Sequence, residues 1–110
     1  MTEIPIGGQN IIMAGTALTK FFDLYGAMLV PYIHPYIYKD IKNIKKFIHH
    51  GNYKSVSFLF YRISNEILNY KCEYTHQYMP LIISLKTFFY KAQDSRLDAY
   101  YYLLNEYPYL

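Results

Sequence analysis

The sequence predicts an all-α fold, a single-domain bundle of four to five helices joined as antiparallel hairpins over residues 1–110. Apolar residues recur at helical spacing in several long segments of the chain. Prolines and glycines separate these segments, as expected where helices begin and end. Hydrophobic residues make up 53% of the chain, so a polypeptide of single-domain length has enough apolar surface to bury a core.

The first nine residues are expected to form an irregular arm, because Pro5 and the two glycines that follow it oppose regular structure. A first helix is expected over about residues 10–30. Its apolar residues follow helical spacing: Ile11, Ala14, Leu18, Phe21, Phe22, Tyr25, Met28 and Leu29. Thr19 and Gly26 fall off this stripe. Pro31 then marks a break, since a residue before proline avoids helical geometry.

A second helix is expected to begin at Pro35, because proline is favoured in the first turn of a helix. Its buried stripe is regular: Ile37, Ile41, Ile44 and Ile48. Gly51 stands where a left-handed residue often ends a helix. The short joint at Gly51 and Asn52 predicts that the second and third helices are antiparallel neighbours.

The third helix is expected from Asn52 to about Lys71, with one apolar face: Val56, Phe60, Ile63, Ile67 and Tyr70. Residues 55–61 alternate in hydrophobicity and would also suit a short strand. Helical periodicity continues for two further turns, which favours the helix.

The joint between these helices also resembles a known repeat. His50-Gly51-Asn52-Tyr53, followed by Val56, Phe60 and Ile63, is similar to the middle of a tetratricopeptide repeat. The resemblance covers under a quarter of the chain, and it implies a helical hairpin at this point. Val56 and Ile63 stand where the family prefers alanine, and no second copy of the pattern is present, although such repeats need neighbours to bury their faces.

Residues 72–80 are expected to form a joint or a kinked helix start, with Pro80 in a first helical turn. The next helical face is strongly apolar: Leu81, Ile82, Leu85, Phe88, Phe89 and Ala92. Ile83 and Tyr90 add a second apolar edge. A helix this apolar is expected either at the centre of the fold or in contact with both its own core and a partner subunit.

Ser95 followed by Asp98 resembles a capping box and predicts the start of the last helix, which Pro108 ends. The residues expected to face inward are Leu97, Tyr100, Tyr101 and Leu104.

The chain has one cysteine, Cys72, which excludes an intramolecular disulfide and is typical of a reducing compartment. No secretory signal is visible at the N-terminus. Lys20 and Asp23 lie near the middle of the most apolar long segment and would each cost about 2.5–3.5 kcal/mol inside a bilayer. We therefore expect no transmembrane segment and a cytoplasmic protein. The composition, rich in tyrosine and poor in arginine, resembles that of small proteins of AT-rich genomes, viral ones included, which would place the protein in a virion or host cytoplasm.

The sequence carries no catalytic motif: it lacks paired carboxylates, a phosphate-binding loop and a nucleophile elbow. We therefore expect a protein that is not an enzyme and that holds no cofactor. Cys72, Glu73 and His76 are weak candidates for a metal site, because a thiol, a carboxylate and an imidazole lie close together along the chain. The competing interpretation of Cys72 and His76 is a buried free cysteine and an interfacial histidine, and that of Glu73 and His76 is a solvated helix face.

One polar stripe is basic and lies opposite the isoleucines of the second helix. It consists of Lys39, Lys42, Lys45, Lys46 and His49. As an ordinary solvated helix face it needs no partner. As a functional surface it would bind the phosphate backbone of a nucleic acid non-specifically, since lysine-rich, arginine-poor surfaces suit backbone contact better than base recognition.

Five tyrosines near the C-terminus form a candidate interface: Tyr100, Tyr101, Tyr102, Tyr107 and Tyr109. Because a helix has one inward face, Tyr102, Tyr107 and Tyr109 are expected to stay exposed in a monomer, where clustered aromatic residues mark an interface. The main hypothesis is a small, self-associating interaction or structural protein, a homo-oligomer or the partner of another protein. The alternative is a nucleic-acid-associated protein that uses the basic helix around residues 39–50.

Overall fold

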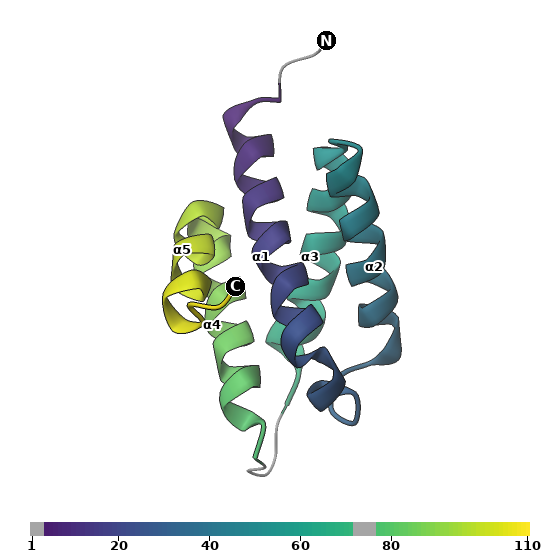
Figure 1. The fold of residues 1–110 in the computed structure, drawn as a ribbon, viewed down its shortest axis with the longest axis vertical. Coiled ribbons are helices and arrows are strands. Elements are labelled where there is room, and N and C mark those ends of the chain that lie inside the picture. The colour runs from purple at the N-terminus through teal and green to yellow at the C-terminus, as the bar shows by residue number, and fades with distance from the viewer. Residues whose placement is uncertain (1–3, 72–76) are drawn as a thin grey trace.

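The computed structural model describes residues 4–71 and 77–110, which form five helices and, within these ranges, no strand. The helices are α1 (Ile6–Leu29), α2 (Pro35–His49), α3 (Tyr53–Asn69), α4 (Met79–Asp94) and α5 (Arg96–Glu106). Consecutive helices run in opposite directions, and α1 lies between the α2–α3 pair and the α4–α5 pair (Figure 1). The prediction of an all-α bundle with antiparallel hairpins is confirmed.

The first helix begins at Ile6, so the expected irregular arm is wrong for residues 6–9. Pro5 occupies the N-cap, where a proline does not interrupt the helical hydrogen bonds. Gly8 faces Tyr53 of α3, and a Cβ atom at Gly8 would lie only 2.8 Å from the ring carbon Cγ. The glycine at this position therefore allows α1 and α3 to approach closely instead of ending the helix.

The hairpin between α2 and α3 forms as its local sequence predicts. Pro35 is in the first turn of α2, and Gly51 has a φ of 69°, a left-handed conformation that glycine adopts without strain. The Asn52 amide donates to the Phe47 carbonyl at 2.9 Å, and the Asn52 side chain accepts from the Ser55 amide at 3.2 Å. Residues 55–61 are helical, so the strand alternative is wrong.

The central helix is α1, and it is buried around most of its circumference. It packs against α2, α3 and α5, whereas α4 packs mainly against α3 and α5 at one side of the bundle. Thr19 and Gly26, which lie off the expected apolar stripe, are buried for this reason. The Thr19 hydroxyl donates to the Thr16 carbonyl at 2.8 Å, which satisfies its hydrogen-bonding need inside the core. The expectation that residues 81–92 form the central helix is wrong.

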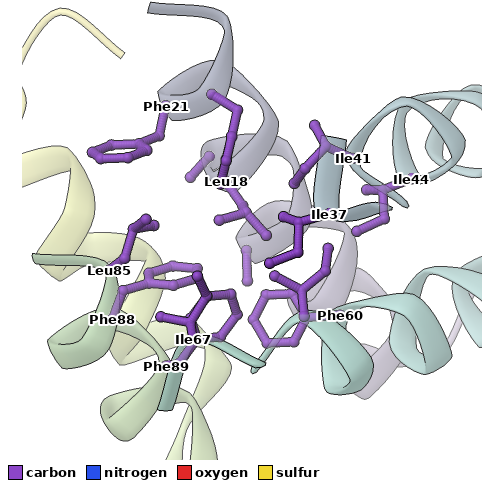
Figure 2. Packing of buried hydrophobic residues seen from close by; sticks show 14 of the residues in the cluster. Leu18, Phe21, Ile37, Ile41, Ile44, Phe60, Ile67, Leu85, Phe88 and Phe89 are labelled. Carbon is purple, nitrogen blue, oxygen red and sulfur yellow. The ribbon is translucent and has the colours of Figure 1, made fainter. Parts of the chain in front are cut away.

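Three phenylalanine rings join α3 to α4. The centroid of Phe60 lies 5.7 Å from that of Phe88 and 5.1 Å from that of Phe89, in edge-to-face arrangements. Phe88 and Phe89 are fully buried, and Figure 2 shows them beside Leu85 and Ile67. Such ring pairs are more favourable than their buried area alone implies. This cluster joins α4 to α3, while α5 packs against α1.

No helix within the described ranges is both long enough and apolar enough to cross a membrane.

Candidate interaction surfaces

The last helix buries a different face from the one expected. Ser95 does cap it, since its hydroxyl accepts from the Asp98 amide at 3.1 Å, and the helix ends at Glu106, before Pro108. The fully buried residues, however, are Ala99 and Leu103. The expected inward face was wrong for Leu97, Tyr101 and Leu104, because α5 turns the smaller Ala99 into the bundle instead, whereas Tyr100 does pack against the core.

The four residues expected inside form a second stripe, the outer stripe of α5, although Tyr100 within it still packs against the core: Leu97, Tyr100, Tyr101 and Leu104. They are spaced i, i+3, i+4 and i+7, so they share one side of the helix. Tyr101 is 53% exposed, and within the described ranges neither Leu97 nor Leu104 packs against the buried core. Leu97, Tyr100 and Leu104 are half-buried, so this helix has a second apolar face that its own fold covers only in part.

Two of the tyrosines expected at the surface turn inward. The Tyr107 hydroxyl donates to Ser84 Oγ of α4 at 2.8 Å, and its ring lies 5.2 Å from Phe21 and 5.3 Å from Tyr25 of α1. Burial raises the pKa of Tyr107. Tyr102 also packs against the core, under Lys91. The expectation of exposure was wrong for these two, and Tyr107 turns inward because the chain after α5 folds back over α1, whereas Tyr109 is 90% exposed.

Acidic side chains flank the outer stripe of α5. Asp94, Asp98 and Glu106 are exposed, and no cationic group of the described residues lies within 4.0 Å of their carboxylates. The nearest basic residues in sequence have other contacts: Arg96 donates to Ser57 Oγ at 3.0 Å, and Lys91 lies over the ring of Tyr102. The surface of α5 is thus apolar along its middle and negatively charged at its two ends.

The basic stripe of α2 is divided by the fold. Lys39, Lys42, Lys46 and His49 are exposed, but Lys45 forms an ion pair with Asp23 of α1. No carboxylate of the described part of the chain lies within 4.0 Å of Lys39, Lys42 or Lys46. We call these three residues the lysine ridge of α2. Spacing of i, i+3 and i+7 aligns them along the solvent side of the helix.

A groove lies beside this ridge, between the end of α2 and the start of α3. It has a volume of about 390 Å³ and is lined by Phe47, Lys54, Ser55, Phe58 and Leu59. Phe58 is 64% exposed, although the Arg62 guanidinium lies 5.6 Å from the centre of its ring. This groove was not predicted from the sequence. Its signal was an aromatic residue, Phe58, on the polar side of an otherwise regular amphipathic helix.

Polar side chains also lock α2 to α3. Arg62 donates from Nε and Nη2 to the two carboxylate oxygens of Asp40, at 2.9 and 2.6 Å, and the Asp40 side chain is only 3% exposed. Next to this pair, a hydrogen bond to Glu66, together with burial, raises the pKa of Tyr36 to about 12. A two-point arginine–carboxylate bond fixes geometry as well as charge. The relative placement of the lysine ridge and the groove is therefore rigid.

On its other side, α2 is held to α1 by Tyr38, whose hydroxyl donates to the Gly26 carbonyl at 2.7 Å. Burial raises the pKa of Tyr38 to about 12. A phenol that stays protonated to higher pH in the folded state than in the unfolded state stabilises the fold below pH 10, and this contribution is lost as the pH rises toward 12.

We therefore expect the melting temperature of the protein to fall between pH 10 and pH 12, and to fall less steeply in Tyr38→Phe. Tyr61→Phe is the matched control, because Tyr61 is 66% exposed. Circular dichroism melts at closely spaced pH values give the slopes. If Tyr38→Phe and the wild type lost stability in parallel, Tyr38 would not be a linked group.

The candidate metal residues Cys72, Glu73 and His76 lie outside the described residues. Within residues 4–71 and 77–110, no group of three or more histidine, cysteine or acidic side chains is close enough to hold a metal ion.

No family model matches the chain, and neither curated proteins nor solved structures give a match. The tetratricopeptide resemblance thus extends no further than the α2–α3 hairpin that it implied.

Proposed function

We propose that this protein is a small assembly protein that associates with further copies of itself through the outer stripe of α5. The single observation that carries the proposal is that α5 has two apolar faces, of which its own fold fully buries only one. Ala99 and Leu103 are fully buried, while Leu97 and Leu104 do not pack on the core of the described chain. Apolar stripes of this kind on a helix are a common means of docking to a protein partner.

Charge supports a second copy as the partner. The acidic groups around the outer stripe have no cationic partner in the described chain, and the lysine ridge of α2 has no acidic one. The chain thus carries both members of a complementary pair of surfaces. Opposite charges at the rim of an apolar contact speed association and select the partner.

The alternative function, binding of a nucleic-acid backbone, has less support from the geometry. Of the five basic residues considered, Lys45 is already paired with Asp23. The three lysines of the ridge would neutralise about three phosphates, whereas DNA-binding proteins with strong salt dependence contact six to ten. The apolar stripe on α5 has no role in that function.

Sedimentation velocity over a range of protein concentrations tests the proposal. We expect the wild type to form species larger than a monomer, and Leu97→Ser combined with Leu104→Ser to remain monomeric. Replacing these leucines removes the apolar contact without opening the buried face of the helix. A wild-type protein that stays monomeric at every concentration reached would overturn the proposal.

The matched control is Ile83→Ser on α4, because Ile83 is 52% exposed and belongs to a different apolar edge. This variant is expected to associate as the wild type does. Loss of association in Ile83→Ser alone would show that the α4 edge is the contact, against the proposal.

A further inference from the structure

We infer that the assembly is head-to-tail, with the outer stripe of α5 in one copy docked in the α2–α3 groove of the next. This inference rests on the proposed function and specifies the surface that receives α5. The groove supplies aromatic surface from half-buried Phe47 and exposed Phe58, and its rim supplies the ammonium group of Lys54. Apolar side chains of α5 would fill the groove while acidic groups meet basic ones around it.

The charges of the two surfaces match each other and oppose a symmetric pairing of α5 with itself. Asp94 ends α4 just before α5, Asp98 lies in the first turn of α5, and Glu106 lies at the end of α5. Two copies of α5 packed antiparallel would place carboxylates opposite carboxylates, and like charges at an interface are unfavourable. Against the α2–α3 side, the same carboxylates meet Lys54 and the lysine ridge.

The positions of the two surfaces exclude mutual docking within a closed pair. The helices α2 and α5 lie on opposite sides of α1 (Figure 1). A two-fold dimer that used both contacts would need the two surfaces on one side of the molecule. Each copy therefore offers one donor and one receptor surface to two different neighbours, which gives an open chain or a ring.

Mixing two variants, each defective in one surface, tests this geometry. The donor-defective variant is Leu97→Ser with Leu104→Ser, and the receptor-defective variant is Lys54→Glu with Phe58→Ser. Each variant alone is expected to be monomeric. An equimolar mixture is expected to form a 1:1 dimer and nothing larger, because one intact donor and one intact receptor remain. The wild type is expected to form longer assemblies that shorten with added salt, since rim charges are screened.

The outcomes distinguish the head-to-tail arrangement from the proposed self-association through α5. A wild type that never associates overturns both. A receptor-defective variant that still associates while the donor-defective variant does not would retain the proposed function and overturn the head-to-tail arrangement. A mixture that stays monomeric also overturns it.

Circular dichroism confirms that each variant is folded before mixing. Lys54→Glu alone is the substitute if the double change unfolds the chain, because Lys54 is exposed in the first turn of α3, where a negative charge favours the helix. This single charge reversal is expected to weaken self-association at low salt and to lose that effect at high salt. An equal loss at both salt concentrations would contradict the charge pairing.

Discussion

Phe88→Ala is expected to lower the free energy of unfolding by about 3–5 kcal/mol, the usual range for removing a fully buried phenylalanine ring. Phe88 is fully buried and lies between Phe60 of α3 and Phe89 of its own helix, with centroids 5.7 and 5.0 Å away. Alanine would leave a cavity at the contact that joins α4 to α3. For a domain whose total stability is on the order of 5–15 kcal/mol, this loss is large.

Urea denaturation followed by circular dichroism measures the difference, at a protein concentration where association adds nothing to stability. Tyr90→Ala, on the same helix, is the control. Because Tyr90 is 64% exposed, its removal is expected to change the stability by about 0.5 kcal/mol or less. Equal losses in the two variants would mean that Phe88 is not at the centre of the α3–α4 contact.

Leu103→Ala and Leu104→Ala are expected to have opposite consequences, although the two leucines are adjacent. Leu103 is fully buried, so its replacement should cost about 2–5 kcal/mol of folding stability. Leu104 belongs to the outer stripe and does not pack on the core of the described chain, so its replacement should cost about 1 kcal/mol or less. Self-association, in contrast, should be weakened by Leu104→Ala.

Chemical denaturation and sedimentation velocity on the wild type, Leu103→Ala and Leu104→Ala check both effects. Alanine is at least as good a helix former as leucine, so neither change weakens α5 through its intrinsic propensity. If Leu104→Ala destabilised the fold as much as Leu103→Ala, α5 would have one continuous apolar circumference rather than two separate faces.

Local signals were enough to predict most of the helix boundaries. The proline at the start of α2, the left-handed Gly51 and the Ser95 cap each act over a few residues, and each occurs where the sequence indicated. The start of α1 was misplaced, because the effect of Gly8 depends on Tyr53, which lies far away in the sequence. Whether a glycine breaks a helix or allows a close contact is decided by the packing partner.

The face that a helix buries was harder to predict when two faces are apolar. In α2 the isoleucine stripe had no competitor. In α5 the larger side chains, Leu97 and Leu104, were expected inside, whereas the fold buries Ala99 and Leu103. Ion pairs between residues far apart in the sequence could not be predicted either. Lys45 with Asp23 and Arg62 with Asp40 each join residues 22 positions apart. The candidate surfaces could be defined only once the partners of these ion pairs were known.

The central position of α1 has a consequence for the synthesis of the chain. This helix leaves the ribosome before the others, and α5, which shields one of its sides, leaves last. Until α5 has been synthesised, that side of α1 lacks the cover that α5 provides, and exposed apolar surface of this kind promotes aggregation or chaperone binding. A nascent chain that stalls before residue 96 would leave this side of α1 exposed, and therefore prone to aggregation, for as long as the stall lasts.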